Sequence, residues 1–481
     1  MKLWLLALLA PLVRARDKER FSEQLWIESF QDGRLLAQFE FVTVLDDVPR
    51  RPDTLDVPDS EQHYTVVPLA LGQILREYAV TELHLLLNAG KWNYQSWGVP
   101  LVPNVASGAE LWAWMGRTHD EAPEIVDARW RGLTNALAGL FCASLGSMDA
   151  RRTIVPGIAF SPEGDLPGDY PHSLRYATMP SEHVCTENLT PFVKLLPCKA
   201  HVGIASLLNP HRLFEADWHG MSITVRWLEG TGIELRLGFG AVMDPVRLSE
   251  DTMRRDWSLH SLFGRPLHKS CLIASKSKIL VGMGPTSEGS VLLPYGPNLH
   301  KISDTQSLAV YDISHNQEEF ELSQQWVDEQ SFEYDDLLLH LVFSPPRDDL
   351  RRASTLEAVL AVPPHATLDV TVSFRKAFIL YTEHPPDAHR GWDLPPAVLT
   401  PLCEASLNAT GLVHSYGLGP LELGANACGS RIYTSTLLVD LATPDFSMPY
   451  NVIIMTSTVV ALFFGSIFNL LTRKFVIVRV A

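Results

Sequence analysis

The chain has 481 residues and carries 55 acidic against 39 basic residues, which gives a formal net charge of −16. This charge argues against nucleic acid as a partner and against peripheral adhesion to anionic lipid, because both would repel an acidic surface. With 46% hydrophobic residues the chain can build a packed core, and its length is sufficient for two or three domains.

The N-terminus is typical of a secretory signal peptide, which we place at residues 1–15. Lys2 is followed by the short apolar run Leu3–Val13, and small residues up to Ala15 offer a cleavage site. A signal anchor or a buried helix is the alternative. The apolar run is too short to span a bilayer comfortably, however, and the charged run Arg16–Arg20 follows at once. We therefore expect the signal to be cleaved.

The first part of the mature chain mixes strand and helix patterns. Residues 35–45 alternate Phe39, Phe41 and Thr43 with polar or smaller neighbours, as in a strand. Residues 71–78 and 125–140 favour helices, because apolar residues in the second segment recur at spacings of three and four. These patterns predict a mixed α+β lumenal domain over residues 16–195.

After Ser222 the hydrophobic period changes to two. Residues 223–239 form two alternating runs around a turn, which predicts a β-hairpin. Residues 368–374 alternate in the same way, with one face expected to be wet, and residues 432–441 are a further β-like run. We expect a β-rich, sandwich-like lumenal domain over residues 196–449, so that the fold class is α+β.

An uncharged run of twenty residues, 452–471, lies near the end of the chain. A helix of this length spans roughly the 30 Å hydrocarbon core of a bilayer, so we expect a transmembrane helix over residues 450–472. Basic residues follow the run directly, which by the positive-inside rule makes residues 473–481 a short cytosolic tail. The expected topology is single-pass type I, with the bulk of the chain lumenal.

Small and polar residues in this run predict a face that packs against other helices. Gly465 and Ser466 permit close approach, while Ser457, Ser466 and Asn469 carry polar groups that need partners in lipid. Alternatively, the serines bond to their own helix backbone and Asn469 reaches the interface. We favour packing against neighbouring subunits.

Six cysteines are too few for a fold held together by disulfides, although most of them should be paired in an oxidising lumen. Asn188-Leu-Thr and Asn408-Ala-Thr are glycosylation sequons, and the first is followed by Pro191. Asn188 and Asn408 are therefore the candidate glycosylation sites.

The sequence carries no recognisable motif of a catalytic or cofactor site. Zincin, nucleophile-elbow, Walker A and paired CxxC motifs are absent. His384 and His389 flank a Pro-Pro-Asp turn without a further convergent ligand, so no metal site is expected. His183 and Cys185 could share a strand face, but a nucleophile–base pair needs a third orienting group, and a structural cysteine is the simpler interpretation. We expect a protein that is not itself an enzyme and has no cofactor.

Short motifs distributed along the whole chain resemble one family. The last of them enclose the apolar run, with Thr443-Pro-Asp-Phe-Ser-Met-Pro-Tyr-Asn451 before it and Gly465-Ser466 and Asn469-Leu-Leu-Thr-Arg473 at its end. The earlier motifs are His63-Tyr64, Leu71-Gly-Gln73, Glu82-Leu-His84, Ser107-Gly-Ala-Glu-Leu-Trp112, Phe141-Cys-Ala-Ser-Leu145, Cys185-Thr-Glu-Asn-Leu-Thr-Pro191, Leu195-Leu-Pro-Cys198 and Asp256-Trp-Ser-Leu259. From about Glu28 to Val476 the chain closely resembles the phosphatidylinositol-glycan class T subunits of GPI transamidase.

The resemblance implies a function in the endoplasmic reticulum membrane. There GPI transamidase removes a C-terminal signal from a proprotein and joins the new carboxyl end to a GPI lipid. In this family catalysis belongs to a separate caspase-like subunit, and the class T subunit is a non-catalytic scaffold that holds that subunit and helps admit the proprotein. The implied partners are the caspase-like subunit, other membrane subunits and the proprotein substrate.

The resemblance also bears on the cysteines. In the family the cysteine of the CTENLTP motif, here Cys185, forms a disulfide with the catalytic subunit; an internal bridge, for instance to Cys198, is the alternative. Cys403 and Cys428 lie where no family cysteines are expected, so we expect them to pair with each other. Cys198 and Cys271 are the next candidate pair. Cys142, in an apolar helical run, would then be a buried free thiol.

One segment of this chain departs from the family pattern. At residues 343–361 the family carries a considerably longer stretch than this chain does.

The alternative function is a single-span cell-surface receptor or adhesion protein with a β-rich ectodomain, although its short cytosolic tail would leave little means of signalling. A GPI-attachment signal at the C-terminus lacks the polar spacer, and basic residues follow the run. A lumenal hydrolase with an unrecognised site is the remaining possibility.

Overall fold

A computed structural model describes residues 19–46, 67–98, 100, 108–118, 120–166, 171–182, 184–228, 232–248, 257–267, 269–282, 319–325, 338–345, 353–361, 367–373, 391–400, 431–440 and 447–472. The chain divides into two units, one made of residues 1–377 with 393–437 and the other of residues 378–392 with 438–481. We describe each unit by itself.

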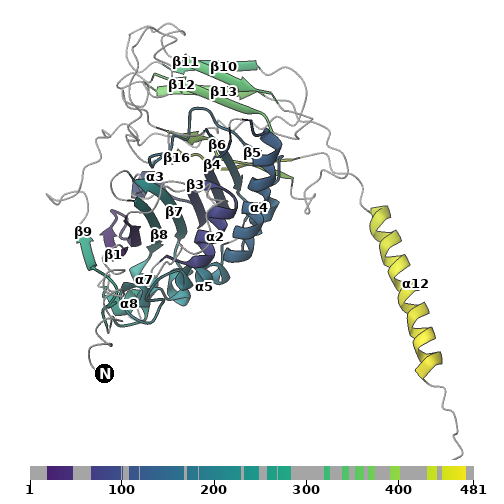
Figure 1. The fold of residues 1–481 in the computed structure, drawn as a ribbon, viewed down its shortest axis with the longest axis horizontal. Helices are drawn as coiled ribbons and strands as arrows, with labels where there is room; N and C mark the ends of the chain where they lie inside the picture. Colours follow the sequence, from purple (N-terminus) through teal and green to yellow (C-terminus); the bar gives the residue numbers. More distant parts are fainter. Residues whose placement is uncertain are drawn as a thin grey trace, which may run out of the picture. The chain divides into compact units, whose positions relative to one another are not determined.

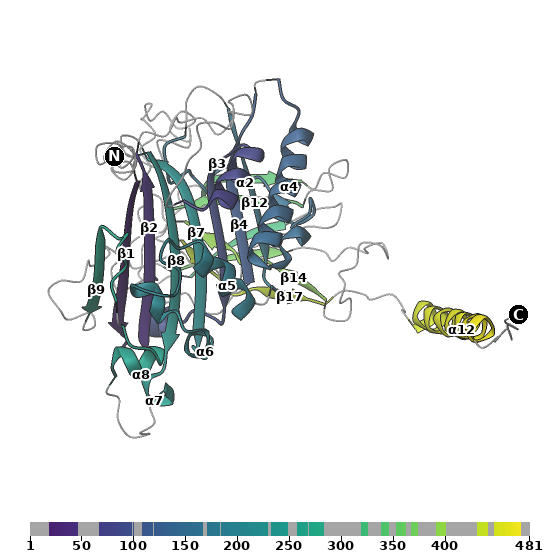
Figure 2. The same ribbon diagram turned by 60° about the horizontal axis from the view of Figure 1, so that its bottom comes forward.

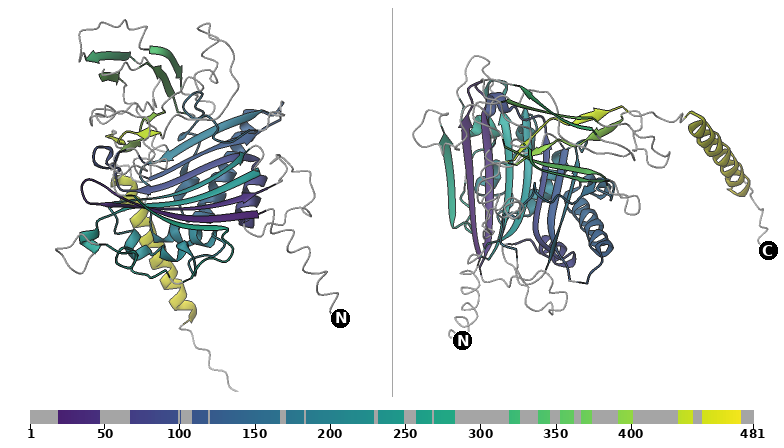
Figure 3. Two further views of the ribbon diagram at one scale, coloured as in Figure 1. Left: turned by 90° about the vertical axis from the view of Figure 1, so that its left-hand side faces the viewer. Right: turned by 90° about the horizontal axis from the view of Figure 1, so that it is seen from above.

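A nine-stranded sheet dominates the first unit (Figures 1 and 2), and it has the strand order β5-β6-β4-β3-β7-β8-β2-β1-β9. Neighbouring strands are antiparallel except β1 and β9, which run parallel. The sheet is twisted, as Figure 3 shows. Its strands are β1 (Glu19–Ser29), β2 (Leu35–Leu45), β3 (Val80–Ala89), β4 (Gly108–Gly116), β5 (Thr153–Ile154), β6 (His172–Met179), β7 (Trp218–Leu228), β8 (Gly232–Met243) and β9 (Lys276–Gly282).

The predicted hairpin at residues 223–239 is confirmed, and it joins the two halves of this sheet. Its strands β7 and β8 pair with each other, while β8 also pairs with β2 and β7 with β3. The predicted strand at residues 35–45 is β2. Strands from both sides of residue 195 therefore belong to one sheet, so the domain boundary predicted at that residue does not separate two independent sheets.

Three helices lie on one face of the sheet (Figure 1): α2 (Leu69–Glu77), α4 (Pro123–Phe141) and α5 (Thr186–Lys194). The predicted helices at 71–78 and 125–140 correspond to α2 and α4. In α4 the residues Val126, Trp130, Leu133 and Leu137 fall on one stripe, and all four are buried against the sheet. The odd-numbered positions of β3 supply the opposing surface through Leu83, Leu85 and Leu87.

The other face of the sheet is lined by aromatic and polar side chains. Trp218 lies close above two glycines of the β7–β8 pair, because a Cβ at Gly220 or Gly240 would approach its ring within 2.8 and 3.0 Å respectively. Trp218 also packs edge-on against Trp92, with ring centroids 4.9 Å apart. The short helical segments of this unit are α3 (Tyr94–Trp97), η3 (Ser144–Ser147), η4 (Ile204–Leu207), α6 (Pro210–Leu213), α7 (Pro245–Leu248) and α8 (Leu259–Phe263).

The described strands after residue 318 pair two by two: β10 with β13, β11 with β12, β14 with β17 and β15 with β16. The predicted run at 432–441 divides into two short strands, β16 and β17. Their bounds are β10 (Glu319–Gln325), β11 (Leu338–Ser344), β12 (Thr355–Leu360), β13 (Thr367–Ser373), β14 (Trp392–Leu394), β15 (Val398–Leu399), β16 (Ile432–Tyr433) and β17 (Leu437–Val439).

The second unit contains the apolar helix α12 (Ser447–Thr472). Residues Tyr450–Leu471 are long and apolar enough to cross a membrane, with a mean hydropathy of 2.0. The predicted α+β, β-rich fold class with one C-terminal apolar helix is thus confirmed.

Candidate functional site

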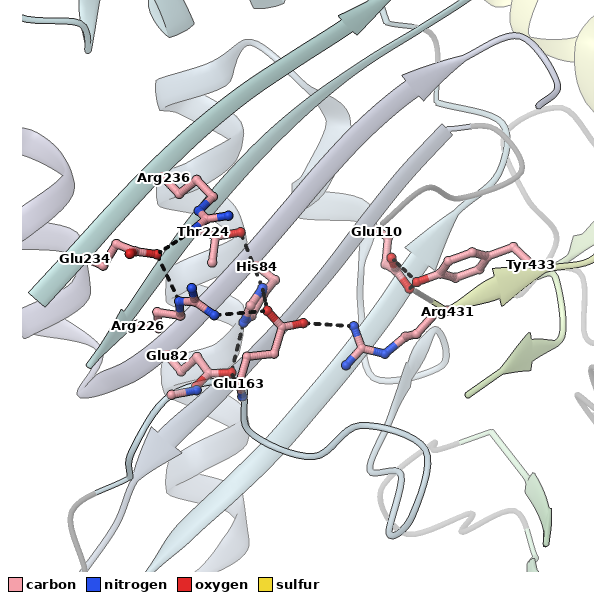
Figure 4. A network of polar contacts seen from close by, with 11 residues as sticks. Glu82, His84, Glu110, Glu163, Thr224, Arg226, Glu234, Arg236, Arg431 and Tyr433 are labelled. Carbon is pink, nitrogen blue, oxygen red and sulfur yellow. Dashed lines mark hydrogen bonds and ion pairs between the residues drawn. The ribbon is translucent and has the colours of Figure 1, made fainter. Parts of the chain in front are cut away.

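A buried polar network lies on the sheet face opposite the three helices, and Figure 4 shows it from close by. Its base is the pair Glu82 and His84 on β3, whose side chains point to this face because their odd-numbered neighbours point to the helices. The two residues are 1% and 4% exposed, and His84 Nε2 lies 2.9 Å from Glu82 Oε1. His84 also stacks on Trp112, with ring centroids 3.6 Å apart.

Glu82 holds the loop that carries Glu163. Its carboxylate accepts hydrogen bonds from the backbone nitrogens of Glu163 at 2.9 Å and Gly164 at 2.8 Å. Since a buried carboxylate is costly without such donors, these bonds explain why an acid is tolerated here. The loop is thereby fixed over β3.

Glu163 is in turn surrounded by positive or titratable nitrogens. Its carboxylate lies 3.2 Å from Arg431, 3.9 Å from Arg226 and 3.9 Å from His84. Burial alone would raise the pKa of Glu163, but the charges of His84, Arg431 and Arg226 outweigh it and lower the pKa. Arg226 also pairs with Glu234 at 3.0 Å, so the network continues onto β8.

Arg431 and Tyr433 bring a distant part of the chain into this network. The Arg431 guanidinium lies 4.8 Å from the ring centroids of both Trp112 and Phe160, which is cation–π geometry. The Tyr433 hydroxyl donates to the Glu110 carboxylate, with Oη 3.1 Å from Oε2. Burial raises the pKa of Glu110 to about 7, although the Arg431 charge opposes the shift.

The network borders a cavity of about 120 Å³. The charged groups that line it are paired with one another: Arg226 and Arg431 with Glu163, and Arg236 with Glu40 at 2.9 Å. Such mutual pairing links segments of the fold and leaves these carboxylates poorly placed to act as free acids or bases. Among the described residues, no group of three or more His, Cys, Asp or Glu side chains could hold a metal ion.

Cys185 is exposed, has a free thiol and occupies the N-cap position of α5. Asn188, three residues later, accepts a hydrogen bond from the Cys185 backbone nitrogen at 2.7 Å. The structure thus presents the sulfur at a fixed point of the surface. His183, which the sequence placed beside it, lies outside the described residues.

Asn188 does not fit the glycosylation that its sequon predicts. It is 1% exposed, and its amide nitrogen donates to the carbonyls of Phe141 at 2.9 Å and Cys142 at 3.0 Å. A glycan on this nitrogen would have to occupy space inside the protein and would disrupt these bonds. The second sequon, Asn408, lies outside the described residues.

Two further predictions about cysteines can be compared with the structure. Cys198 and Cys271, a predicted candidate pair, form a disulfide with their Cα atoms 6.0 Å apart. The prediction that Cys142 is buried in a helix was wrong, because it is an exposed free thiol at the C-cap of α4 with φ +54°. Cys403 and Cys428 lie outside the described residues, as do His384 and His389.

In α12 the hydroxyls of Thr456, Ser457 and Thr458 donate to carbonyls one turn earlier in the same helix. Ser457 therefore follows the alternative interpretation in which the side chain bonds to its own backbone. At Gly465 an added Cβ would meet nothing within 4 Å. Contacts within the described chain therefore do not require a glycine at this position. Because Gly465 has no side chain, the helix surface is flat there.

The buried network is not apparent from the sequence. Glu82 and His84 gave one available signal, since two ionisable residues alternate with leucines in an otherwise apolar strand. Arg431 and Tyr433 gave none, because they meet Glu163 and Glu110 only through contacts 268 and 323 positions apart in sequence.

The chain is similar to known proteins over nearly its whole length. The family described as Gpi16 subunit, GPI transamidase component, matches residues 4–254 and 327–481. The mouse (Mus musculus) GPI-anchor transamidase component PIGT is 31% identical, over 95% of this chain and 90% of the relative. The fission yeast (Schizosaccharomyces pombe) GPI transamidase component PIG-T homolog is also 31% identical, over 97% and 92%. The budding yeast (Saccharomyces cerevisiae) GPI transamidase component GPI16 is 26% identical, over 96% and 90%.

Proposed function

Because this chain belongs to the Gpi16 family of GPI transamidase components, we propose that it is a non-catalytic scaffold subunit of that complex. In this role it holds a caspase-like catalytic subunit and helps the proprotein to reach it. The observation that carries the proposal is the exposed, unpaired Cys185 at the start of α5, which offers a sulfur for a disulfide with another chain.

The local structure around Cys185 supports this use. The N-cap position is fixed by the Asn188 side chain, which itself is anchored to the end of α4. An interchain bond formed here would therefore be attached to the sheet and helix core of the first unit and not to a loose loop. Cys198 is engaged with Cys271, so the alternative internal bridge from Cys185 to Cys198 is not formed.

The buried polar network supports a scaffold in a second way. Its acids and bases hold the β16 region, residues 431–433, on the sheet of the first unit. In the sequence this region lies shortly before the apolar helix α12. A scaffold that is attached to a membrane and carries other subunits needs such firm internal connections, whereas a catalytic site needs groups with free hydrogen-bonding capacity.

We also propose the topology that the sequence predicts. Residues 1–15 are a signal peptide, residues 16–195 and 196–449 are lumenal, α12 crosses the endoplasmic reticulum membrane, and 473–481 are cytosolic. In this topology Asn408 remains the proposed glycosylation site, and Cys403 and Cys428 remain a proposed disulfide pair. The open Gly465 surface, with Ser466 and Asn469, packs against helices of other subunits.

The test is purification of the tagged full-length chain from its own membranes, followed by electrophoresis with and without reductant. We expect a reductant-sensitive heterodimer with a caspase-like protein in the wild type, and its loss in Cys185→Ser. Cys142→Ser, which removes the other exposed free thiol among the described residues, is the matched control and should retain the heterodimer. A chain recovered as a monomer from the plasma membrane would contradict the proposal and favour a receptor.

A further inference from the structure

Asn188 carries a glycosylation sequon on a side chain whose hydrogen-bonding groups are engaged inside the protein. The sequon is Asn188-Leu189-Thr190, and a glycan would be attached to the Asn188 amide nitrogen, Nδ2. This nitrogen donates to the carbonyls of Phe141 at 2.9 Å and Cys142 at 3.0 Å. Because a glycan replaces one of its two hydrogens, at least one of these bonds would be lost.

The same side chain positions the start of α5. Asn188 Oδ1 accepts a hydrogen bond from the Cys185 backbone nitrogen at 2.7 Å, and the residue is 1% exposed. One buried carboxamide therefore joins the N-cap of α5 to the end of α4. A sugar on this carboxamide would separate the two, since the site has no space for it.

Burial in the folded protein does not protect Asn188 at the time when glycans are added. In the proposed topology the chain meets the transferase as it enters the lumen, before its sheet and helices have packed. The transfer forms a bond between Asn188 Nδ2 and the first sugar of a lipid-pyrophosphate oligosaccharide. The nitrogen loses one proton, and the lipid pyrophosphate leaves. Protection must therefore come from residues next to the sequon.

Pro191, which follows the sequon directly, is unfavourable in the helix that contains it. It is the sixth residue of α5. Proline lacks a backbone N–H and its ring crowds the carbonyl four residues earlier, here that of Glu187, so an interior proline destabilises a helix. Pro191 is half-buried, whereas Leu189 and Phe192 on either side are 3% and 0% exposed and provide the core contacts. The structure of α5 thus does not explain the proline.

In the unfolded chain the same ring restricts the sequon. The residue before a proline is driven to extended conformations, and here that residue is Thr190, whose hydroxyl completes the sequon. Proline is excluded from the middle position of an acceptor sequon. A proline on the other side of the threonine restricts the same short peptide, so it should lower its acceptance of a glycan.

We propose that Pro191 keeps Asn188 free of glycan, so that Asn188 can act as the positioning residue for Cys185. This inference rests on the proposed function, in which the chain is lumenal and Cys185 bonds to another subunit. The unmodified carboxamide holds the N-cap of α5 on the end of α4 and so fixes the backbone that carries the Cys185 thiol. The proline weakens α5 but protects the side chain on which the start of this helix depends.

The experiment compares tagged full-length chains produced in their own cells and purified from membranes. Peptide N-glycosidase in heavy-oxygen water converts each glycosylated asparagine to a labelled aspartate, and mass spectrometry measures the labelled fraction at Asn188. We expect a fraction close to zero in the wild type and a fraction at least about tenfold higher in Pro191→Ala. The labelled fraction at Asn408, whose sequon is unchanged, should be the same in both chains.

A second variant separates the effect of the glycan from that of the missing proline. Pro191→Ala should lose most of the reductant-sensitive heterodimer formed through Cys185, because its glycosylated chains cannot bury Asn188. Thr190→Ala/Pro191→Ala has no sequon and should recover the heterodimer to the wild-type level. This double variant should also melt no lower than the wild type, since Thr190 is exposed and alanine favours a helix.

Three results would overturn the inference. The first is a glycan on Asn188 in the wild-type chain, and the second is an Asn188 that stays unmodified in Pro191→Ala. The third is a double variant that melts below the wild type or does not recover the heterodimer, since Pro191 would then be needed for the fold. Failure of the proposed function would look different, because the wild-type chain would form no heterodimer while Pro191→Ala still gained a glycan on Asn188.

Discussion

The hydroxyl of Tyr433 donates a hydrogen bond to the carboxylate of Glu110, a residue 323 positions earlier in the chain, with Oη 3.1 Å from Oε2. Both side chains are buried, and the neighbouring Arg431 pairs with Glu163. The β16 region is therefore held on the sheet by polar groups as well as by packing. Buried polar pairs of this kind specify one arrangement strongly, because each group left without its partner is costly.

Replacing Tyr433 by phenylalanine should weaken this attachment. The ring still fills its space, but the Glu110 carboxylate loses a donor inside the protein, which we expect to cost about 1–3 kcal/mol of unfolding free energy. Thermal unfolding of the full-length chain in detergent measures the loss. Ser435→Ala, an exposed position in the same segment, is the control and should stay within about 0.5 kcal/mol. Equal stability of Tyr433→Phe and wild type would show that this bond adds nothing.

Glu110 should make stability fall as the pH rises. Its pKa is about 7 in the folded chain against 4.5 ordinarily, so the folded state holds a proton that the unfolded state has released between these values. The contribution of Glu110 to the unfolding free energy should therefore decrease from pH 4.5 to 7, by up to about 3 kcal/mol. Glu110→Gln imitates the protonated acid and should remove this decrease. A variant with the same pH slope as wild type in urea titrations would refute the assignment.

His219 should make stability rise as the pH rises, which is opposite to the effect of Glu110. Burial lowers its pKa from 6.5 to about 4, so the unfolded chain binds the extra proton between these values. Its contribution to stability is complete above pH 6.5 and is lost as the pH falls toward 4, by up to about 3 kcal/mol. His219→Leu keeps the position apolar beside Phe214 and should flatten the acid side of the profile. The pH ranges in which Glu110 and His219 change the unfolding free energy overlap, and the two contributions have opposite signs. The pH profiles of the two single variants should therefore differ from each other more than either differs from the wild-type profile. Parallel profiles for both variants would contradict the two assignments.

The Cys198–Cys271 disulfide should contribute strongly to stability, because it closes a loop between residues 73 positions apart. Loop-closure entropy predicts about 4 kcal/mol for a loop of this length. It also fixes the surroundings of Glu23, a buried carboxylate that accepts from Ile204 and Ser277. The double variant Cys198→Ser/Cys271→Ser should unfold at a distinctly lower temperature than wild type. An unchanged melting temperature, with loss of the linked peptide verified, would refute this.

Much of the local structure could be predicted from the sequence. Alternation of apolar residues located β2 and the β7–β8 hairpin, and spacings of three and four located α4, because these periods follow directly from strand and helix geometry. The apolar helix α12 followed from its length and lack of charge. The cysteines were harder to interpret, since spacing does not determine pairing. The structure confirms the Cys198–Cys271 pair and corrects the burial expected for Cys142.

By itself, then, the sequence determined the strand at 35–45, the hairpin at 223–239, the helices at 71–78 and 125–140, the place of the apolar helix, and a resemblance to one family along nearly the whole chain. Only the tertiary structure decided that β7 and β8 connect the two halves of one sheet, that the buried Asn188 side chain bonds to the backbones of Cys142 and Cys185, and that Tyr433 reaches Glu110. The physical reason is the separation in sequence between the residues that make these contacts. Periodicity records which face of its own element a residue occupies, whereas these contacts join residues tens to hundreds of positions apart and depend on how the faces pack.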